Sequence, residues 1–347
     1  MKHLIYESDE KAYHSKAFDL CFGDLSTGSF DIETTGLSPA RSYVILIGFM
    51  ELSDEGCRLH QFLAENLSEE EDIIRAFLDV AKDTDVLLTY NGRSFDIPFM
   101  EKRMSMYPAL ADEKLRFYDL DMYTVISRFS PLKSFLPNLK QKTVESFLGL
   151  WTSREDEISG AESVDLYFRY LSDRDPETEE LILCHNRDDV LQLARLMQVL
   201  RKTDFHKAMY DMGFPMKRLP GAPQSALPES IVVNKISITP QHLEVCGKQQ
   251  YNGTTRMIFE SAETPFTLGM DSVDMDFHAS LPLVVHENMK NLFIADLRPL
   301  GIEEEPFAVY PQFSDGLLVL QNGNDIYYPQ AVHFVREFLN KAIWNNK

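Results

Sequence analysis

The sequence is poor in cysteine and in basic residues, and each scarcity excludes a class of protein. Four cysteines occur in 347 residues without any Cys-x-x-Cys spacing: Cys21, Cys57, Cys184 and Cys246. Neither a cysteine zinc site nor a disulfide framework is therefore expected, and we predict four buried, reduced thiols. The chain has 34 basic against 54 acidic residues, a net charge of -20. This charge argues against a broad basic surface that holds nucleic acid along its backbone.

Long apolar runs are missing as well. The longest, around Tyr43 to Met50, is far shorter than the roughly 20 residues of a membrane-spanning helix. The N-terminal MKHLIYESDEK has no apolar core of signal-peptide length. We therefore expect a cytoplasmic protein without a membrane segment. A content of 44% hydrophobic and 25% charged residues is ordinary for a soluble globular chain.

The first half of the chain alternates between strand and helix patterns. Apolar periodicity predicts strands over 29–33, 43–52, 57–63 and 85–90, and helices over about 68–81 and 97–106. A strand, a helix and a strand in succession indicate an α/β layer architecture. From Leu120 onward the pattern is helical, and it ends in a long amphipathic segment from Pro176 to Lys202.

A Pro- and Gly-rich segment then separates this half from a strand-rich one. We predict a first domain over 1–205, a linker over 206–228, and a smaller C-terminal α+β domain, mainly β, over 229–347, with a closing helix around 330–343. The role of that last domain cannot be read from its sequence. Its acidic cluster lacks the spacing of a Ca²⁺ loop and is predicted to be a solvated strand edge: Asp271, Asp274, Asp276 and His278.

The chemistry of the chain centres on Asp31 and Glu33. They are two positions apart at the end of a predicted strand, so both side chains project from one face. Adjacent carboxylates repel one another and resist burial unless a cation lies between them. Oxygen donors of this kind suit Mg²⁺ or Mn²⁺. The Thr-Thr-Gly turn that follows, beginning at Thr34, offers donors to a phosphate or a terminal nucleotide.

Two further motifs add acidic residues in the same domain. Asn91-Gly92-Arg93-Ser94-Phe95-Asp96 places a carboxylate just after the predicted strand 85–90. His185-Asn186-Arg187-Asp188-Asp189 places an imidazole and a carboxylate four residues apart, on one face of a helix. Asp188 is an alternative to Asp189, but the i, i+4 spacing from His185 favours Asp189.

These three motifs, DIETTGL, NGRSFD and HNRDDV, resemble in order and character the motifs of the DEDD 3'-5' exonuclease superfamily, which has an RNase H-like fold. The stretch from Leu136 to Leu150, followed by EISG, DLYFRYL and CHNRDDVLQLARL, is more narrowly similar to the YprB-type ribonuclease H-like exonucleases of bacteria. The resemblance covers about 28–200. It implies an RNase H-like mixed sheet flanked by helices.

The resemblance also implies roles for individual residues. Four acids would be ligands of two divalent metal ions, Mg²⁺ or Mn²⁺: Asp31, Glu33, Asp96 and Asp189. His185 would orient or deprotonate the attacking water, a role that suits imidazole because its pKa is near neutrality. In the histidine branch of the superfamily the His precedes the last Asp by five positions and in the tyrosine branch a Tyr precedes it by four. Here His185 precedes Asp189 by four positions, which is the spacing of the tyrosine branch.

Other residues of the motifs have two interpretations each. Leu37 and Phe95 either stack against bases, as the resemblance implies, or belong to the core. Asn91 either donates to substrate or forms the turn before Gly92. Lys140 and Lys142 either contact phosphate or lie on a solvated helix face.

Two functional hypotheses follow from the motifs and the charge. Residues 1–205 carry 23 basic and 38 acidic residues, and residues 206–347 carry 11 and 16. This distribution disfavours salt-sensitive binding of long duplexes but is compatible with binding of a short single-stranded end through metal ions. The first hypothesis is a metal-dependent 3'-5' exonuclease acting on single-stranded or frayed nucleic acid ends. The second is a catalytically inactive RNase H-like binding or scaffold protein, whose C-terminal domain recruits a protein partner.

Overall fold

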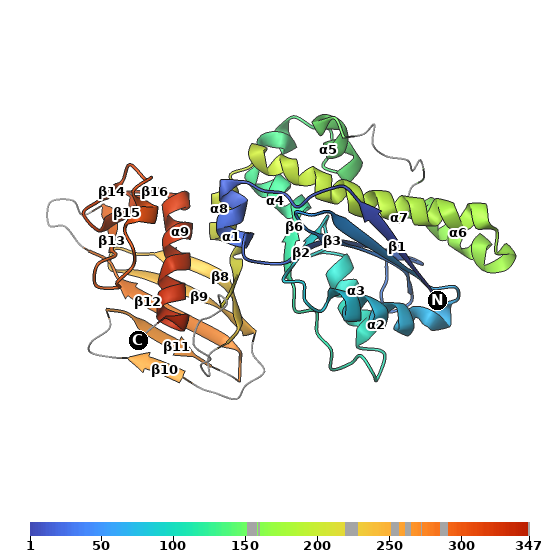
Figure 1. Ribbon diagram of the computed structural model, residues 1–347, viewed down its shortest axis with the longest axis horizontal. Helices are drawn as coiled ribbons and strands as arrows, with labels where there is room; N and C mark the ends of the chain where they lie inside the picture. Colours follow the sequence, from blue (N-terminus) through green and yellow to red (C-terminus); the bar gives the residue numbers. More distant parts are fainter. Residues whose placement is uncertain are drawn as a thin grey trace. The chain divides into compact units, whose positions relative to one another are not determined.

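The structure is a computed structural model, and it describes residues 1–150, 158, 160–218, 228–250, 257–260, 265–271, 273–284 and 291–345. The chain forms two units (Figure 1). Unit 1 comprises Met1–His14 and Leu25–Thr203, and unit 2 comprises Ser15–Asp24 and Asp204–Lys347. An early segment containing helix α1 (Lys16–Phe22) thus belongs to unit 2.

The unit boundaries differ from the division expected from composition. The segment 206–228, expected as a linker, contains most of helix α8 (Phe205–Met212) and strand β7 (Phe214–Lys217), both of which are part of unit 2. Gly213 follows the end of α8, and Pro215 lies inside β7, so neither residue belongs to a linker. Pro215 is tolerated because β7 is an edge strand of its sheet.

Unit 1 is built on a six-stranded mixed sheet. Its strands lie in the order β1 (Lys2–Ser8), β4 (Cys57–Leu63), β3 (Val44–Leu52), β2 (Thr27–Thr34), β5 (Val86–Thr89) and β6 (Tyr118–Asp121). The pairs from β1 to β2 are antiparallel, whereas β2–β5 and β5–β6 are parallel. The mixed sheet and four of its strands confirm the prediction, and β1 and β6 are additional to it.

Helices cover both faces of this sheet (Figure 1). The helices of unit 1 are α2 (Glu70–Ala81), α3 (Asp96–Met104), α4 (Met122–Phe129), α5 (Gln141–Leu148), α6 (Gly160–Asp173) and α7 (Pro176–Leu196), with short turns η1 (Leu67–Glu69), η2 (Pro131–Ser134) and η4 (Met197–Lys202). The buried side chains of α2 and α3 pack with one face, and those of α6 and α7 pack with the other. The flanking helices confirm the predicted α/β architecture.

Strand β2 shows why the two faces differ. Phe30 and Ile32 belong to the apolar core beneath α2, and the Phe30 ring lies 5.0 Å from that of Phe77. The alternate residues face α7, where the Ser29 hydroxyl donates to the backbone oxygen of Val190 (3.0 Å). Because side chains alternate along a strand, β2 places its polar residues against α7 and its apolar residues in the core.

A glycine on β3 allows α7 to lie close to the sheet. A Cβ added at Gly48 would overlap the side-chain amide of Asn186 and lie 2.7 Å from a methyl group of Val190. Both residues are on α7, which therefore approaches the sheet at a distance that other side chains at position 48 would prevent. This close approach positions the helix that carries the His185 motif.

A buried ion pair holds the segment that follows β2. The carboxylate of Glu70 is fully buried and accepts hydrogen bonds from the Val44 amide (2.7 Å) and from Arg103 Nε (2.8 Å) and Nη2 (2.5 Å). Tyr107 Oη donates to the same carboxylate (2.5 Å). Arg103 Nη1 also donates to the backbone oxygen of Pro39 (3.1 Å). Helices α2 and α3 are thereby joined to the loop after the DIETTGL motif.

Unit 2 contains two antiparallel sheets and few helices among its described residues. The larger sheet has the order β10 (Met257–Glu260), β11 (Thr267–Met270), β12 (Asp276–Pro282), β9 (His242–Gln250), β8 (Ser230–Ile238) and β7, and the smaller contains β13 (Leu292–Asp296), β15 (Leu317–Asn322), β14 (Phe313–Ser314) and β16 (Asp325–Ile326). Helix α9 (Tyr328–Leu339) continues into a π-helical turn, η6 (Asn340–Trp344), and a short turn, η5 (Glu305–Phe307), precedes β14. The mainly β composition and the closing helix confirm the prediction.

Two predictions for smaller features need correction. Strand β12 lies between β11 and β9, so Asp276 and His278 are exposed on the face of an interior strand and not on a sheet edge. Asp276 forms an ion pair with Lys248 (2.6 Å), while Asp274 precedes the strand in a turn. No disulfide joins the four cysteines, as predicted, but only Cys21 and Cys57 are fully buried.

Among the described residues, no helix combines the length and the apolar character needed to cross a bilayer.

Candidate active site

A cleft of about 850 Å³ in unit 1 collects side chains from all three motifs. It is lined by Asp31, Ile32, Glu33, Thr34, Thr35, Gly36, Leu37, Tyr90, Asn91, Phe95, Asp96, Lys140, Gln141, Lys142, Ile158, Glu162, Val164, His185 and Asp189. Every candidate site residue from the sequence lines this cleft. Asp188, the alternative to Asp189, is buried and does not line it.

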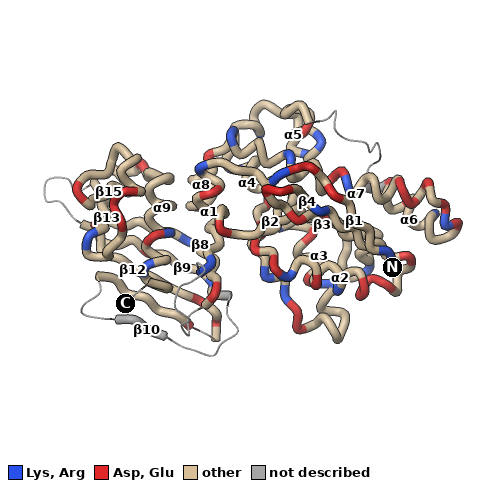
Figure 2. Tube along the Cα trace, in the orientation of Figure 1, with Lys and Arg blue, Asp and Glu red and all other residues tan. Residues whose placement is uncertain are grey.

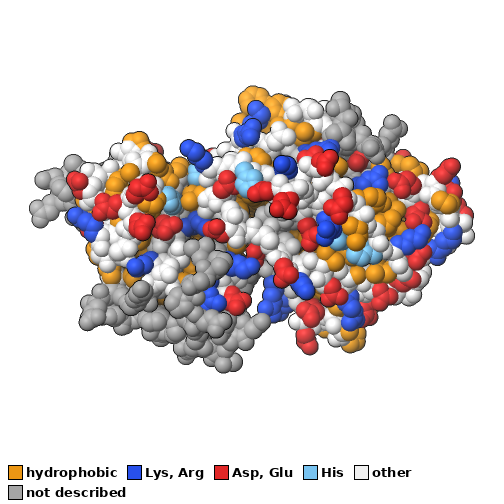
Figure 3. Space-filling view, viewed as in Figure 1, with side chains coloured by type: hydrophobic (Ala, Val, Ile, Leu, Met, Phe, Trp, Pro, Cys, Tyr) orange, Lys and Arg blue, Asp and Glu red, His pale blue; other side chains and the backbone are white. Residues whose placement is uncertain are grey.

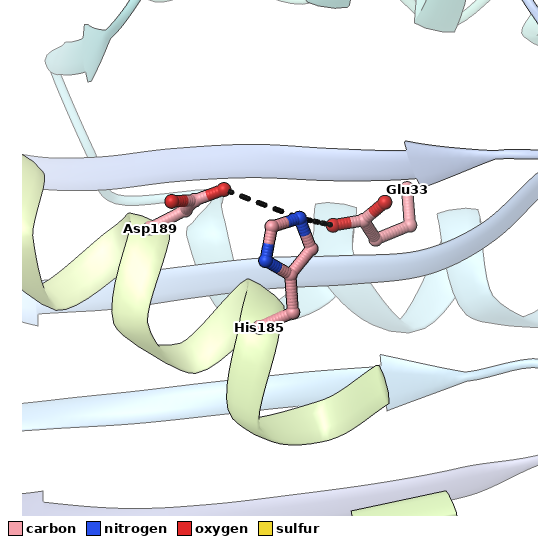
Figure 4. A group of neighbouring side chains, drawn as sticks. All are labelled: Glu33, His185 and Asp189. Atoms are coloured by element: carbon pink, nitrogen blue, oxygen red, sulfur yellow. Dashed lines mark ion pairs between the residues drawn. The ribbon is translucent and has the colours of Figure 1, made fainter. Parts of the chain in front are cut away.

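Glu33, His185 and Asp189 form the tightest cluster in the cleft (Figure 4). His185 Nε2 lies 3.6 Å from Glu33 Oε1 and 3.7 Å from Asp189 Oδ2. One atom of each residue lies within 4.8 Å of the other two, a spacing that allows a single cation to contact all three. The i, i+4 spacing on α7 brings His185 and Asp189 to one side of the helix, and β2 brings Glu33 to meet them.

Asp31 is held by a neighbour of His185. Asn186 Nδ2 donates to Asp31 Oδ2 (3.1 Å), and Asn186 Oδ1 accepts from Gln61 Nε2 (2.9 Å). Gln61 Nε2 also donates to the backbone oxygen of Leu183 (2.9 Å). Strands β2 and β4 are thus connected to α7 by a buried amide pair, which orients the Asp31 carboxylate.

Burial and the neighbouring acids raise the pKa of Asp31 and Asp96 in this cleft. Burial, followed by the charges of Asp189, Asp96 and Glu33, raises the pKa of Asp31 well above its ordinary value, against the lowering effect of the Asn186 hydrogen bond. Burial raises the pKa of Asp96 to about 7, although the backbone amides of Asp96 and Ile32 favour its ionised form. Clustered acids that resist ionisation become favourable as carboxylates when a cation binds between them.

The donor set fits a hard divalent cation. Asp31, Glu33, Asp96 and Asp189 supply carboxylate oxygens, the ligands that Mg²⁺ and Mn²⁺ prefer. Cysteine sulfur does not line the cleft. His185 lies close enough to Glu33 and Asp189 to be a ligand as well, or to exchange a proton with a bound water.

Asp96 stands at the start of α3, directly after the turn that follows β5. The turn is fixed by Asn91, which has a left-handed backbone (φ 68°) and whose amide donates to Asp121 Oδ1 (2.7 Å). The backbone oxygen of Asn91 accepts from the amides of Ser94 and Phe95 (3.0 and 3.1 Å). Asn91 thus forms the turn before Gly92, and it also lines the cleft.

The remaining predicted binding residues have different environments. Thr34 is buried, and its hydroxyl donates to the Gly36 backbone oxygen (3.0 Å), so it stabilises the turn. Leu37 is 86% exposed at the cleft and belongs to no core. The Phe95 ring is half-buried against Phe99, at 5.4 Å between ring centroids.

Sequence reasoning missed several side chains that build the cleft. Gln141 Nε2 donates to the backbone oxygen of Asp189 (3.0 Å), and Tyr90 Oη donates to the backbone oxygen of Leu139 (2.5 Å). Glu162, on α6, adds a further acid to the lining, and Asn186 orients Asp31. The hydrogen-bond partners of Gln141, Tyr90 and Asn186 lie between 48 and 155 positions away along the chain. No local spacing in the sequence therefore identifies these residues.

Comparison with known proteins places the first part of the chain in a family. Residues 29–201 match the model of the RNase H superfamily. The uncharacterized protein YprB of Bacillus subtilis (strain 168) is 28% identical over 169 residues, which are 48% of this chain and 40% of YprB. The DNA polymerase of Pyrococcus glycovorans is 36% identical over 91 residues, 23% of this chain and 12% of the polymerase.

Among solved structures, the family B DNA polymerase of Pyrobaculum calidifontis aligns with 92% of this chain and 46% of its own, with a TM-score of 0.43 and 17% identity. The matched part of the chain spans less than half the length of YprB and of the Pyrococcus glycovorans polymerase. Through residues 29–201, with the three acidic motifs gathered in one cleft of a mixed sheet, the chain belongs to the RNase H superfamily as a YprB-type RNase H-like protein.

Proposed function

We propose that this protein is a metal-dependent 3'-5' exonuclease that hydrolyses phosphodiester bonds at single-stranded or frayed nucleic acid ends. The observation that carries the proposal is the single cleft that unites Asp31, Glu33, Asp96 and Asp189 with His185. Membership of the RNase H superfamily and the sequence similarity to DNA polymerases support a nuclease-type hydrolase. A cytoplasmic location is part of the proposal, since no disulfide joins the four cysteines.

The four carboxylates would hold two divalent cations. When bound, such cations lower the pKa of a coordinated water and neutralise the charge that develops on the phosphate. The chain's part is to present the carboxylates together, and the raised pKa values of Asp31 and Asp96 reflect how costly this arrangement is without a cation. Asn186 would keep Asp31 in one orientation through its 3.1 Å hydrogen bond.

His185 would take the proton from the attacking water. Its Nε2 lies beside both Glu33 and Asp189, and the side chain is buried at one wall of the cleft. Oxygen of the water forms the new bond to phosphorus, the bond from phosphorus to the 3' oxygen of the preceding nucleotide breaks, and that oxygen receives a proton. The products are a 5' mononucleotide and a strand shortened by one nucleotide.

The rim of the cleft suits a strand end. Leu37 and Phe95 line the cleft and would offer apolar surface to the terminal base, and Asn91 and the turn that Thr34 begins would contact the terminal sugar and phosphate. Acidic residues exceed basic ones by 15 in residues 1–205. Extended contact with duplex phosphates is disfavoured by this charge, whereas binding of a single-stranded end is compatible with it.

The experiment is hydrolysis of 5'-labelled single-stranded DNA and RNA oligonucleotides in Mg²⁺ or Mn²⁺. We expect a ladder that shortens from the 3' end with at least one polymer, and loss of that ladder in Asp31→Asn and Asp189→Asn. Asp112→Asn, an exposed acid outside the cleft, is the control of equal charge change. No shortening by the wild-type protein, or shortening that persists in Asp31→Asn, would refute the proposal.

A further inference from the structure

The segment 128–147, which runs from the end of α4 through η2 to α5, reverses the charge of its surroundings. It contains four cationic side chains and a single acid, Glu145, which is fully buried. The cations are Arg128, Lys133, Lys140 and Lys142. Residues 1–205 as a whole carry 23 basic and 38 acidic residues. A local positive surface therefore lies within an acidic unit.

Three of the four cations of this segment are available to a ligand. Arg128, Lys133 and Lys140 are exposed, and no carboxylate of the described residues forms an ion pair with any of them. In Figure 2, Lys and Arg flank α5 on both sides. Cations without acidic partners attract phosphate more strongly than cations that are already paired.

Aromatic rings are exposed on the same segment. Phe135, just after η2, is 74% exposed, and Phe147, near the end of α5, is 47% exposed. The Lys202 ammonium lies 5.9 Å from the Phe147 ring centre. Figure 3 shows hydrophobic side chains and Lys or Arg side by side over α5. Exposed rings interspersed with cations are the pattern of surfaces that stack bases and hold the backbone of a single strand.

This surface is continuous with the cleft. Lys140, Gln141 and Lys142 line the cleft and also begin α5. The hydrogen bond from Gln141 to the Asp189 backbone ties α5 to the catalytic turn of α7, and the one from Tyr90 to the Leu139 backbone ties the preceding loop to the end of β5. The segment 128–147 therefore extends the wall of the cleft onto the neighbouring surface.

We propose that the part of the substrate strand upstream of the terminal nucleotide lies across the segment 128–147. Its phosphates contact Arg128, Lys133 and Lys140, and its bases stack on Phe135 and Phe147. This inference rests on the proposed function, because it concerns the same strand. It explains how a unit of net negative charge holds more than the end of a polynucleotide.

The test is the affinity for fluorescent 12-nucleotide oligo(dT) and oligo(U), measured in the Asp189→Asn background so that no strand is cut. Arg128→Glu with Lys133→Glu is compared with Lys82→Glu and Lys114→Glu, two exposed lysines outside the segment, which change the net charge by the same amount. We expect the first pair to weaken binding about tenfold and to flatten the salt dependence by about 1.4 in log–log slope, about 0.7 for each lost phosphate contact. Equal effects of the two pairs would overturn the inference.

Removal of a ring provides the second variant. Phe135→Ala should weaken oligonucleotide binding by at least about fivefold, because a stacked base is lost, while the melting temperature stays within error since the ring is exposed. Unchanged affinity in Phe135→Ala together with Phe147→Ala would also overturn the inference.

The inference and the proposed function fail in different ways. If the wild-type protein hydrolyses no oligonucleotide, the proposed function is wrong, and the binding comparison still decides whether the segment holds a strand. If the wild type hydrolyses strands but both charge-reversed pairs bind alike, the function stands and the inference is wrong. Absence of any oligonucleotide binding contradicts both.

Discussion

The substitution Asp96→Asn should stabilise the protein in the absence of metal while it weakens the cation site. Burial raises the pKa of Asp96 from 3.8 to about 7, so above neutral pH the native state must ionise a carboxyl that prefers its proton. Asparagine has nearly the same shape and no charge. The gain in stability measures the free energy that the native state loses by ionising Asp96 when no cation is bound.

Linkage gives both the sign and the size of this effect. The unfolded chain loses the Asp96 proton near pH 3.8, whereas the native state retains it until about pH 7. The contribution of this group to stability is therefore fully present below pH 3.8 and is lost as the pH rises towards and through 7. Between pH 5 and pH 8 the loss is about 2 to 3 kcal/mol, and Asp96→Asn removes it.

Urea unfolding in EDTA at pH 5 and pH 8 measures the difference. Relative to Asp96→Asn, the wild-type protein should lose about 2 to 3 kcal/mol between the two pH values. Asp112→Asn, the exposed control, should follow the wild type. Equal pH dependence of Asp96→Asn and the wild type would show that Asp96 does not carry the strain assigned to it.

Three further predictions concern buried groups elsewhere in the two units. Arg103→Met should cost about 3 to 5 kcal/mol in urea unfolding, because it leaves the fully buried Glu70 charge without its partner; a cost below 1 kcal/mol would contradict this. Gly48→Ala should cost about 1 to 3 kcal/mol of stability and lower the rate of hydrolysis, because the added Cβ displaces the side-chain amide of Asn186 on α7. Calorimetric melting and the oligonucleotide assay measure the two effects. Unchanged stability and activity would mean that α7 can move away from the sheet at no cost. Burial, followed by the charges of Arg336 and His206, lowers the pKa of His333 to about 4. The stability that this neutral imidazole contributes above pH 6.5 should therefore fall by up to about 2 kcal/mol as the pH drops to 5. His333→Phe should reduce this loss in urea unfolding, and an identical pH profile would exclude His333 as its source.

Local periodicity was enough to predict which face of the sheet carries the acids of the cleft. Strand alternation places Asp31 and Glu33 on one face, and helical spacing places His185 and Asp189 on one side of α7, as the structure has them. The mixed sheet with helices on both faces is likewise predictable, because strand and helix patterns alternate over the first half of the chain.

The features that sequence reasoning missed depend on distant pairing. Asn186 meets Asp31 across 155 positions, and Gln61 meets Asn186 across 125. Strand β6 has four residues, two of them aspartates, and acquires strand structure only beside β5. Segment Ser15–Asp24 joins unit 2 although it lies early in the chain, and no local pattern encodes that long-range packing.

The most direct test of the metal site is a calorimetric titration of the wild-type protein with Mn²⁺ at pH 8. We predict binding of two ions per chain, tighter at pH 8 than at pH 6 because the acids must lose their protons, and loss of binding in Asp31→Asn combined with Asp189→Asn. No Mn²⁺ binding by the wild-type chain, or equal binding by the double variant, would contradict the assignment of this cleft as a metal-dependent catalytic site.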